Sequence, residues 1–315
     1  MRIWRSIDQV PEDLGRTVVT IGNFDGVHLG HQHVIARATE VAQQHEVARV
    51  VAVTFDPHPI AVLRPEHAPL ALTSVDTRIE LLADAGVDDV LVIPFDRDMA
   101  NWSPERFVED ILVRALRARA VVVGANFRFG HRAAGDVATL RTVGETHDFV
   151  VEPVALDGGP QVWSSTYVRT CLAAGDVEGA AEALGRPFTV RGTVSRGDQR
   201  GRELGFPTAN VPAGGGLAVP ADGVYAGWLR VRGEAETPAY PAAISVGTNP
   251  TFEGERDRRV ESYVLDRDDL ELYDAEVDVA FVGRVRGMVR FDGVDALVTQ
   301  MRDDVERTRK ILGLG

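Results

Sequence analysis

Lysine and cysteine are nearly absent from this chain of 315 residues: Lys310 is its one lysine and Cys171 its one cysteine. Because the one lysine lies near the C-terminus, the chain can form neither a G-x-x-x-x-G-K-[ST] phosphate loop nor the strand lysine of protein kinases. A single cysteine excludes an intramolecular disulfide and a thiolate metal cluster. Any bound nucleotide must therefore be held by arginine, histidine, backbone amides and a metal ion such as Mg²⁺.

Long apolar runs are also absent. None approaches the length of a membrane span, and the N-terminal stretch MRIWRSIDQVPEDL has no apolar core of signal-peptide length. The formal net charge of −13 repels nucleic acids and anionic membranes over most of the surface. We therefore expect a cytoplasmic protein without a nucleic-acid or membrane partner. The composition does not indicate self-association, so oligomerisation stays open.

A change of pattern near residue 185 divides the chain. Its 315 residues exceed the size at which one hydrophobic core usually keeps growing, so two domains are expected. Asp176 and Gly185 bracket a short helix, and Pro187 prevents its continuation. Beyond this point the apolar residues follow a period of two instead of a helical period. We predict domains over residues 1–185 and 186–315.

Strand-like and helix-like patterns alternate through the first domain. This alternation predicts a doubly wound parallel α/β sheet, which is a Rossmann-like fold. Strands are expected over residues 18–21, 48–54, 90–94, 120–123 and 149–154, and helices over 29–41, 76–85, 103–115, 137–145 and 177–184. Ligands bind at the carboxyl ends of such strands. The stretches GNFDGVHLGH, FDPHP and GANFRFG each follow a strand, so we expect them to meet in one crevice.

The stretch GNFDGVHLGH has the features of a phosphate site. Gly22 ends the first strand, and a helix with an apolar face follows. His28 and His31 are three residues apart at the helix entrance, so they share one face beside unpaired backbone N–H groups. Gly26 and Gly30 let the backbone approach a ligand closely. A helix start with two added donors predicts phosphate binding, although capping and packing alone would explain the same residues.

Two further loops of the first domain carry candidate ligand contacts. Phe127 and Phe129, with Asn126 before them, could sandwich a flat heterocycle and hydrogen-bond to it, whereas each phenylalanine alone could be an ordinary core residue. Phe55 and His58 belong to the FDPHP loop. A histidine between prolines is more often a turn residue than a ligand.

The stretch SSTYVRT offers a second phosphate contact. The helix that runs through residue 172 can be capped by Ser164, Ser165 or Thr166. Arg169 falls on its first turn, so hydroxyls, free backbone amides and a guanidinium would face one anion. A routine N-cap with an exposed arginine is the alternative.

The second domain shows the pattern of an antiparallel sheet or small barrel that ends in a helix. Short alternating runs are separated by Gly, Pro and Asp clusters. Asp292 is a plausible N-cap of the terminal helix. Its apolar stripe, expected to dock on the barrel, consists of Val294, Leu297, Val298, Met301 and Val305.

Two stretches of the second domain carry candidate chemistry. In PTAN, Thr208 and Asn210 are two residues apart, so in an extended segment their side chains point the same way and offer neutral oxygens to Mg²⁺. In RRVESYVLD, Glu261 would share a strand face with Tyr263. T-x-N alone is no metal motif, and a strand glutamate is usually just solvated.

These motifs resemble those of a known family. H-L-G-H after G-N-F-D-G is similar to the H-x-G-H signature of nucleotidyltransferases, which transfer AMP or CMP and release pyrophosphate. G-x-V-x-x-G-x-x-x-G-R-x-L-G-F-P-T-A-N, then G-V-Y, N-P-T-F and V-E-S-Y, resembles the riboflavin kinase domain. The whole chain thus resembles the bacterial bifunctional riboflavin kinase/FAD synthetases. Asn126 stands where many members have Asp, and Asp274 stands where Gly is common.

The resemblance implies two reactions and a set of residues. The second domain would phosphorylate riboflavin to FMN with Mg-ATP, Glu261 acting as the general base while Thr208 and Asn210 hold Mg²⁺. The first domain would adenylate FMN to FAD and release pyrophosphate. Charge on the pyrophosphate would be neutralised by His28, His31, Ser165 and Arg169. Further ATP or phosphate contacts would be Gly22, Phe24, Gly30, Ser164, Thr166, Gly197, Arg202 and Thr208, and flavin contacts Phe55, His58, Asn126, Phe127 and Phe129.

Two alternatives remain at this stage. A nucleotidyltransferase for another acceptor, such as a nicotinamide or pantetheine nucleotide, would explain the first domain but leave the second without a role. A non-catalytic flavin sensor predicts loss of His28, His31 or Glu261, and all three are present.

Overall fold

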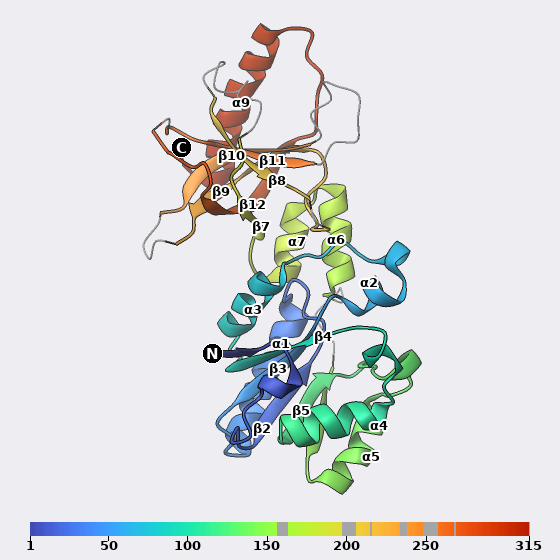
Figure 1. The fold of residues 1–315 in the computed structure, drawn as a ribbon. Coiled ribbons are helices and arrows are strands. Elements are labelled where there is room, and N and C mark those ends of the chain that lie inside the picture. Colours follow the sequence, from blue (N-terminus) through green and yellow to red (C-terminus); the bar gives the residue numbers. More distant parts are fainter. Residues whose placement is uncertain are drawn as a thin grey trace. The chain divides into compact units, whose positions relative to one another are not determined.

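The chain forms two compact units, Met1–Ser164 and Ser165–Gly315, each with its own sheet (Figure 1). The computed structural model describes residues 1–155, 163–196, 206–214, 216–233, 238–247, 258–267 and 269–314. The predicted phosphate contacts Gly197 and Arg202 lie outside these residues. The two units are described separately.

The first unit contains a six-stranded sheet in the order β1-β4-β3-β2-β5-β6, and every neighbouring pair is parallel. The strands are β1 (Arg2–Trp4), β2 (Thr17–Ile21), β3 (Val50–Asp56), β4 (Asp89–Pro94), β5 (Ala118–Gly124) and β6 (Val150–Val154). The chain runs outward from β2 in one direction through β3 and β4, and in the other through β5 and β6. This confirms the predicted doubly wound fold and places its switch point between β2 and β5.

Helices connect these strands. They are α1 (Leu29–Gln44), α2 (Pro59–Leu63), α3 (Val75–Asp84), α4 (Pro104–Phe107) and α5 (Val137–His147), with short 3₁₀ turns at Ile7–Gln9, Pro65–His67, Met99–Asn101 and His131–Ala133. Ser103 caps α4 by accepting a hydrogen bond from the Arg106 backbone N–H at 3.2 Å. The predicted helix then continues as a π-helix, η4 (Val108–Ala115), because its backbone bonds shift by one residue.

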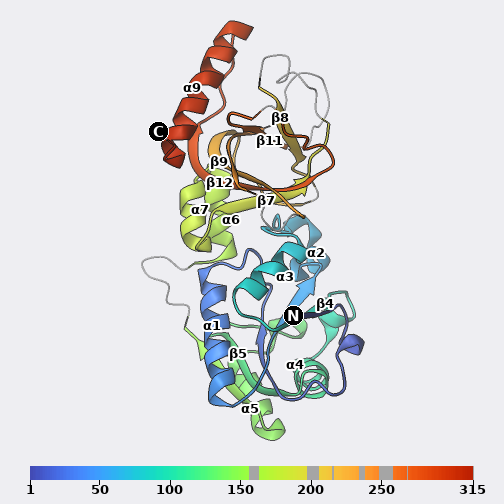
Figure 2. The same ribbon diagram turned by 90° about the vertical axis from the view of Figure 1, so that its left-hand side faces the viewer.

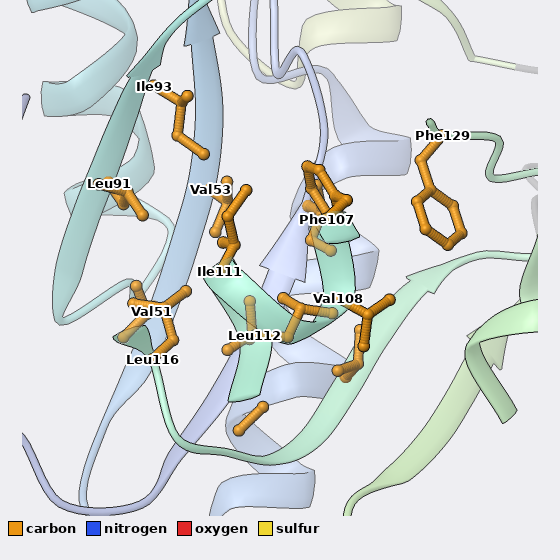
Figure 3. Packing of buried hydrophobic residues seen from close by; sticks show 14 of the residues in the cluster. Val51, Val53, Leu91, Ile93, Phe107, Val108, Ile111, Leu112, Leu116 and Phe129 are labelled. Carbon is orange, nitrogen blue, oxygen red and sulfur yellow. The ribbon is translucent and has the colours of Figure 1, made fainter. Parts of the chain in front are cut away.

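Apolar side chains cover both faces of this sheet. On one face, Val51 and Val53 of β3 pack with the residues of η4, as Figure 3 shows. On the other face, Ala52 packs with residues of α1 and α3, such as Ile35 and Ile79. Burial on both faces explains why the strands read as continuous apolar runs and not as alternating ones.

The second unit contains an antiparallel sheet in the order β7-β12-β9-β10-β11-β8. Its elements are α6 (Ser165–Ala174), α7 (Val177–Leu184), β7 (Phe188–Thr193), β8 (Thr208–Pro212), β9 (Gly223–Val231), β10 (Tyr240–Gly247), β11 (Arg259–Val264), β12 (Glu276–Arg286) and α9 (Val294–Leu312). The backbone N–H of Ser195 donates to the Asn210 carbonyl at 2.8 Å. This single bridge joins the chain after β7 to β8, so the two edge strands approach each other and the sheet curls into the antiparallel barrel-like fold that the sequence predicts.

The terminal helix α9 packs on β9, β10 and β12 (Figure 2). Its predicted details were partly wrong, since the N-cap is Gly293 instead of Asp292, and Val294 is 59% exposed. Asp304 is buried on the docked face, where it accepts hydrogen bonds from the Arg286 guanidinium at 2.7 to 3.1 Å. A buried ion pair therefore anchors the helix beside its apolar contacts.

The helix before the predicted boundary has the caps that the sequence indicates. Asp176 accepts a hydrogen bond from the Gly179 N–H at 2.9 Å, and Gly185 ends α7 with a φ of 69°. Contacts nevertheless join α6 and α7 to the barrel, because Arg284 of β12 donates to the Ala174 carbonyl at 3.0 Å. The compact units therefore separate after Ser164, and the boundary at residue 185 stays a prediction.

Candidate active sites

The loop between β2 and α1 has an unusual backbone. Phe24, Gly26 and Val27 all have positive φ, at 48°, 80° and 40°. The left-handed region suits glycine, but it is strained for a β-branched residue such as Val27, at a cost on the order of 1–3 kcal/mol. Such strain persists only where the surrounding structure fixes the loop.

Asp25 supplies that fixation. Its carboxylate is buried and accepts hydrogen bonds from the backbone N–H of Leu72 at 2.9 Å and of Thr73 at 3.2 Å. The Thr73 hydroxyl also donates to this carboxylate, at 3.3 Å. Asp25 therefore holds the strained loop against the segment that precedes α3. The sequence reasoning missed this role, because an acidic residue in a turn follows an ordinary pattern.

The two histidines of the loop lie face to face. The rings of His28 and His31 stack with centroids 3.7 Å apart, and Phe24 meets His31 edge-on at 5.2 Å. A Cβ atom at Gly30 would lie 3.1 Å from the His28 ring, and one at Gly22 would lie 3.2 Å from the Phe24 ring. The i, i+3 spacing thus brings the pair together as predicted, and the glycines leave room for it.

His31 is held in its neutral form. Burial lowers its pKa well below 6.5, and the nearby His28 and Arg78 lower it further. Arg78 lies on α3, is 4% exposed, and has its own pKa lowered by burial. A neutral imidazole can still donate one N–H to a phosphate oxygen without bringing a buried charge. The sequence reasoning missed Arg78, because an arginine on a helix is usually exposed.

The two rings of the predicted aromatic sandwich lie directly on each other, and their role in binding a ligand stays a prediction. Phe127 and Phe129 stack on each other with centroids 5.4 Å apart, whereas a heterocycle between two rings needs a separation of about 7 Å. Phe129 is buried against Phe107 (Figure 3), so the core interpretation holds for that residue. Phe127 is half-buried, and Asn126 is exposed just before it. Of the three predicted contacts in this loop, Phe127 and Asn126 are the more exposed.

The FDPHP loop follows β3 at the same edge of the sheet. Phe55 meets Phe95 edge-on at 5.8 Å and is only partly buried. His58 caps the short helix α2, since its Nδ1 accepts a hydrogen bond from the Ile60 N–H at 3.1 Å. The loops after β2, β3 and β5 therefore meet at the carboxyl ends of three neighbouring parallel strands, where ligands of such sheets bind.

The SSTYVRT stretch forms a helix start as predicted. Ser164 ends the first compact unit, and α6 begins at Ser165 in the second. Thr166 is exposed and Arg169 is half-buried on this helix. A phosphate clamp that joins these residues to the histidine pair would span the two units, so it stays a prediction.

In the barrel, strand register brings four polar and aromatic side chains to one face. Asn210 of β8 lies directly opposite Glu261 of β11, and Thr208 lies opposite Tyr263. Because side chains alternate along a strand, all four point the same way. The Asn210 Nδ2 lies 3.4 Å from the Thr208 Oγ1, and Phe206 meets Tyr263 edge-on at 5.1 Å.

Comparisons with known proteins identify the chain. Residues 10–166 match the FAD synthetase family, and residues 184–312 match the riboflavin kinase family. A bifunctional riboflavin kinase/FMN adenylyltransferase of Escherichia coli strain K12 is 36% identical over 98% of this chain and 96% of its own length. The chain belongs to this bifunctional family. The corresponding protein of Bacillus subtilis strain 168 is 34% identical over 94% of this chain and 92% of its own.

A solved structure shares the fold of this family member. It is described as a macrolide-efflux protein from Streptococcus pneumoniae, is 30% identical, covers 98% of both chains and has a TM-score of 0.85. Within the described ranges of our chain, no helix is long and apolar enough to cross a membrane.

Asp274, which stands where glycine is common in the family, fits the turn in which it lies. Asp274 adopts a φ of 62° in the turn before β12, and its N–H donates to the Val194 carbonyl at 3.0 Å. Aspartate tolerates the left-handed region better than most residues, so the turn forms without glycine. The effect of Asn126 on substrate contact stays a prediction.

Proposed function

We propose that the chain makes FMN from riboflavin and ATP in its riboflavin kinase half, and FAD from FMN and ATP in its FAD synthetase half. The observation that supports this assignment best is the match of both families to successive halves of one chain. A nucleotidyltransferase for another acceptor would leave the second half without a role. A cytoplasmic location fits the single cysteine of the chain.

In the FAD synthetase half, the FMN phosphate is already an anion, so the reaction needs no basic residue to generate the nucleophile. The phosphate oxygen would attack the α-phosphorus of ATP, and pyrophosphate would leave. Catalysis would rest on positioning and on stabilising the charge that builds on the leaving group. His28 and His31 would donate to that group, while Ser165 and Arg169 would contact the same phosphates.

The remaining candidate contacts of this half follow from the arrangement of the loops. Gly22, Phe24 and Gly30 would shape the phosphate loop around the nucleotide. Phe127 would stack on one face of the flavin instead of sandwiching it, with Asn126 as a hydrogen-bonding partner. Phe55 and His58 of the neighbouring loop would face the flavin as well, together with the remaining members of the SSTYVRT cap, Ser164 and Thr166.

In the riboflavin kinase half, Glu261 would accept the proton of the ribityl hydroxyl as that oxygen attacks the γ-phosphorus of ATP. Thr208 and Asn210 would hold Mg²⁺. The Asn210 Nδ2 donates to the Thr208 carbonyl at 3.3 Å and lies 3.4 Å from Thr208 Oγ1, so metal binding would require the amide to rotate and give up its bond to that carbonyl. Neighbouring ligands of octahedral Mg²⁺ are about 3 Å apart. Bound Mg²⁺ would neutralise charge on the ATP phosphates.

One experiment tests this proposal. The purified full chain is incubated with riboflavin and Mg-ATP, and FMN and FAD are followed by chromatography, with pyrophosphate measured in parallel. We expect FMN to appear first and FAD afterwards. Flavin binding without turnover would favour the sensor alternative. Adenylation of a nicotinamide or pantetheine nucleotide in preference to FMN would favour a different acceptor.

A further inference from the structure

A single buried hydroxyl joins the loop after β2 to helix α3 at the ligand edge of the first unit. Thr54, near the end of β3, is fully buried. Its Oγ1 donates to the carbonyl of Asn23 at 3.1 Å and accepts a hydrogen bond from the Arg78 guanidinium at 3.3 Å. Thr54 therefore connects the phosphate loop, residues 22–31, with the helix α3.

Arg78 extends this connection to the second loop. Its Nη1 also donates to the carbonyl of Phe55 at 3.1 Å, so one guanidinium nitrogen touches both Thr54 and Phe55. Phe55 opens the flavin loop, residues 55–58. Because Arg78 is buried and donates to this carbonyl, the position of the carbonyl is tied to that of α3.

The start of α3 is tied back to the phosphate loop. Asp25 accepts from the backbone of Leu72 and Thr73, and Ser74 then caps α3 by accepting from the Thr77 N–H at 3.2 Å. The contacts form a closed circuit. It runs from the phosphate loop through Asp25 to α3, from α3 through Arg78 to the flavin loop, and through Thr54 back to the phosphate loop.

Stability alone does not explain a buried guanidinium here. Removing such a charge from water costs several kcal/mol, and an apolar side chain of similar volume is often as stable or more so. The Arg78 Nε makes no hydrogen bond to any described residue, so the burial is only partly compensated. What arginine provides and an apolar residue cannot is a donor that ties α3 to the end of β3, at the Thr54 hydroxyl and the Phe55 carbonyl.

We propose that Arg78 is a positioning residue that couples the two ligand loops, so that occupation of the phosphate loop by ATP changes the affinity of the flavin loop for FMN. The inference rests on the proposed function of the first unit. ATP phosphates would draw residues 22–31 into one arrangement, and the circuit would transmit it to residues 55–58. Linkage makes the effect reciprocal, so FMN changes the affinity for ATP by the same factor.

The test is the interaction factor between the two substrates, measured in the full chain. Initial rates of FAD formation are recorded over a matrix of ATP and FMN concentrations, and the factor is the ratio of KM for FMN at vanishing and at saturating ATP. The kinase half makes no FAD, so it does not disturb the measurement. We expect a factor of about 5 or more in the wild type, the lower end of typical coupling.

Two variants break the circuit at different bonds. Arg78→Met is expected to bring the factor to about 1. Arg78→Lys is expected to restore it only in part, because the lysine side chain is one bond shorter and its ammonium reaches the two acceptors less well. Thr54→Val preserves the shape of the side chain and removes both of its hydrogen bonds, so it keeps the test open if Arg78→Met fails to fold. In the double variant Arg78→Met/Thr54→Val, the interaction factor should be no lower than in either single variant, since both substitutions break the same circuit.

Controls separate the inference from its premise. Arg114→Met removes an exposed helix arginine that pairs with Asp110 at 2.6 Å, and it should leave the factor unchanged. Riboflavin phosphorylation should be unchanged in every variant. A wild-type factor of 1, or a wild-type factor retained in Arg78→Met or in Thr54→Val, overturns the coupling role. A wild type that makes no FAD at all overturns the proposed function instead.

Discussion

Replacing Glu261 by glutamine removes a proton acceptor from the barrel while keeping the size of the side chain. The residue lies opposite Asn210 in the ladder of β8 and β11, so the Cβ atoms of the pair are about 5 Å apart. Glutamine can occupy the same place and still accept a hydrogen bond through its amide oxygen. The free energy of unfolding should therefore change by no more than about 0.5 kcal/mol.

The kinetic effect should be much larger than the structural one. General-base catalysis contributes about 10² to 10⁴ in rate, so Glu261→Gln should raise the activation barrier of riboflavin phosphorylation by roughly 2.7 to 5.4 kcal/mol. FAD formation from added FMN should not change, because it belongs to the other unit. Both half-reactions are measured by chromatography over a Mg²⁺ series. Thr208→Ala should weaken Mg-ATP binding and recover at high Mg²⁺, which the glutamine variant should not.

A matched control is available on another strand of the same sheet. Glu276 begins β12 and pairs with Arg232 at 3.3 Å, and Glu276→Gln should leave both reactions at wild-type rates. If Glu261→Gln still phosphorylates riboflavin at nearly the wild-type rate, Glu261 is a solvated strand residue and the base lies elsewhere.

Three other outcomes are expected. His31→Ala should lower FAD formation by about 10² to 10³, the usual loss of one preorganised donor, and spare FMN formation; an equal fall in both would indicate misfolding. Because burial lowers the His31 pKa, the unfolded chain binds more protons than the folded chain below about pH 6.5. The free energy of unfolding should therefore fall as the pH drops from 7.5 to 5.5, and this fall should be smaller in His31→Gln. A fragment of residues 186–315 should fold and make FMN. In denaturant melts its free energy of unfolding should be lower by about 1 kcal/mol or more than that of a fragment of residues 165–315, because only the longer fragment keeps the Arg284 bond to Ala174. Equal stability of the two fragments would contradict this expectation.

The strands of the first unit were predictable because their signal is local. Apolar runs bounded by turn residues predicted β2 to β6 within about two residues at most ends. Strand β1 was missed, since Arg2–Trp4 is too short to show a period and only Trp4 is buried. The π-helix η4 was also missed, because its apolar residues fit a helical stripe whichever hydrogen bonds the backbone makes.

The histidine pair could be predicted from local spacing, whereas the arrangement of the barrel site depends on strand register. The i, i+3 spacing alone predicts that His28 and His31 face each other. Alternation predicts that Thr208 and Asn210 share a face, but the register that sets Glu261 opposite Asn210 joins residues 51 positions apart, and only the family resemblance indicated it.

The buried circuit of the first unit could not be predicted in the same way. Asp25 contacts a segment 47 residues further along the chain, and Arg78 contacts a strand 24 residues before it. Each residue alone follows an ordinary pattern, since acids occur in turns and arginines on helix surfaces. Their joint burial is a property of the packed sheet, so only the three-dimensional structure reveals it.

The proposed metal ligands of the barrel make chemical sense together with Glu261. If carboxylates held Mg²⁺, they would neutralise part of its charge and leave less for the ATP phosphates. They would also place negative charge beside a glutamate that must accept a proton. Thr208 and Asn210 are neutral, so Mg²⁺ would keep its full charge toward the nucleotide, with Glu261 as the one carboxylate among the four side chains of that face. Under this assignment, Asn210→Asp should strengthen Mg²⁺ binding yet slow riboflavin phosphorylation, and a variant that is faster at every Mg²⁺ concentration would contradict it.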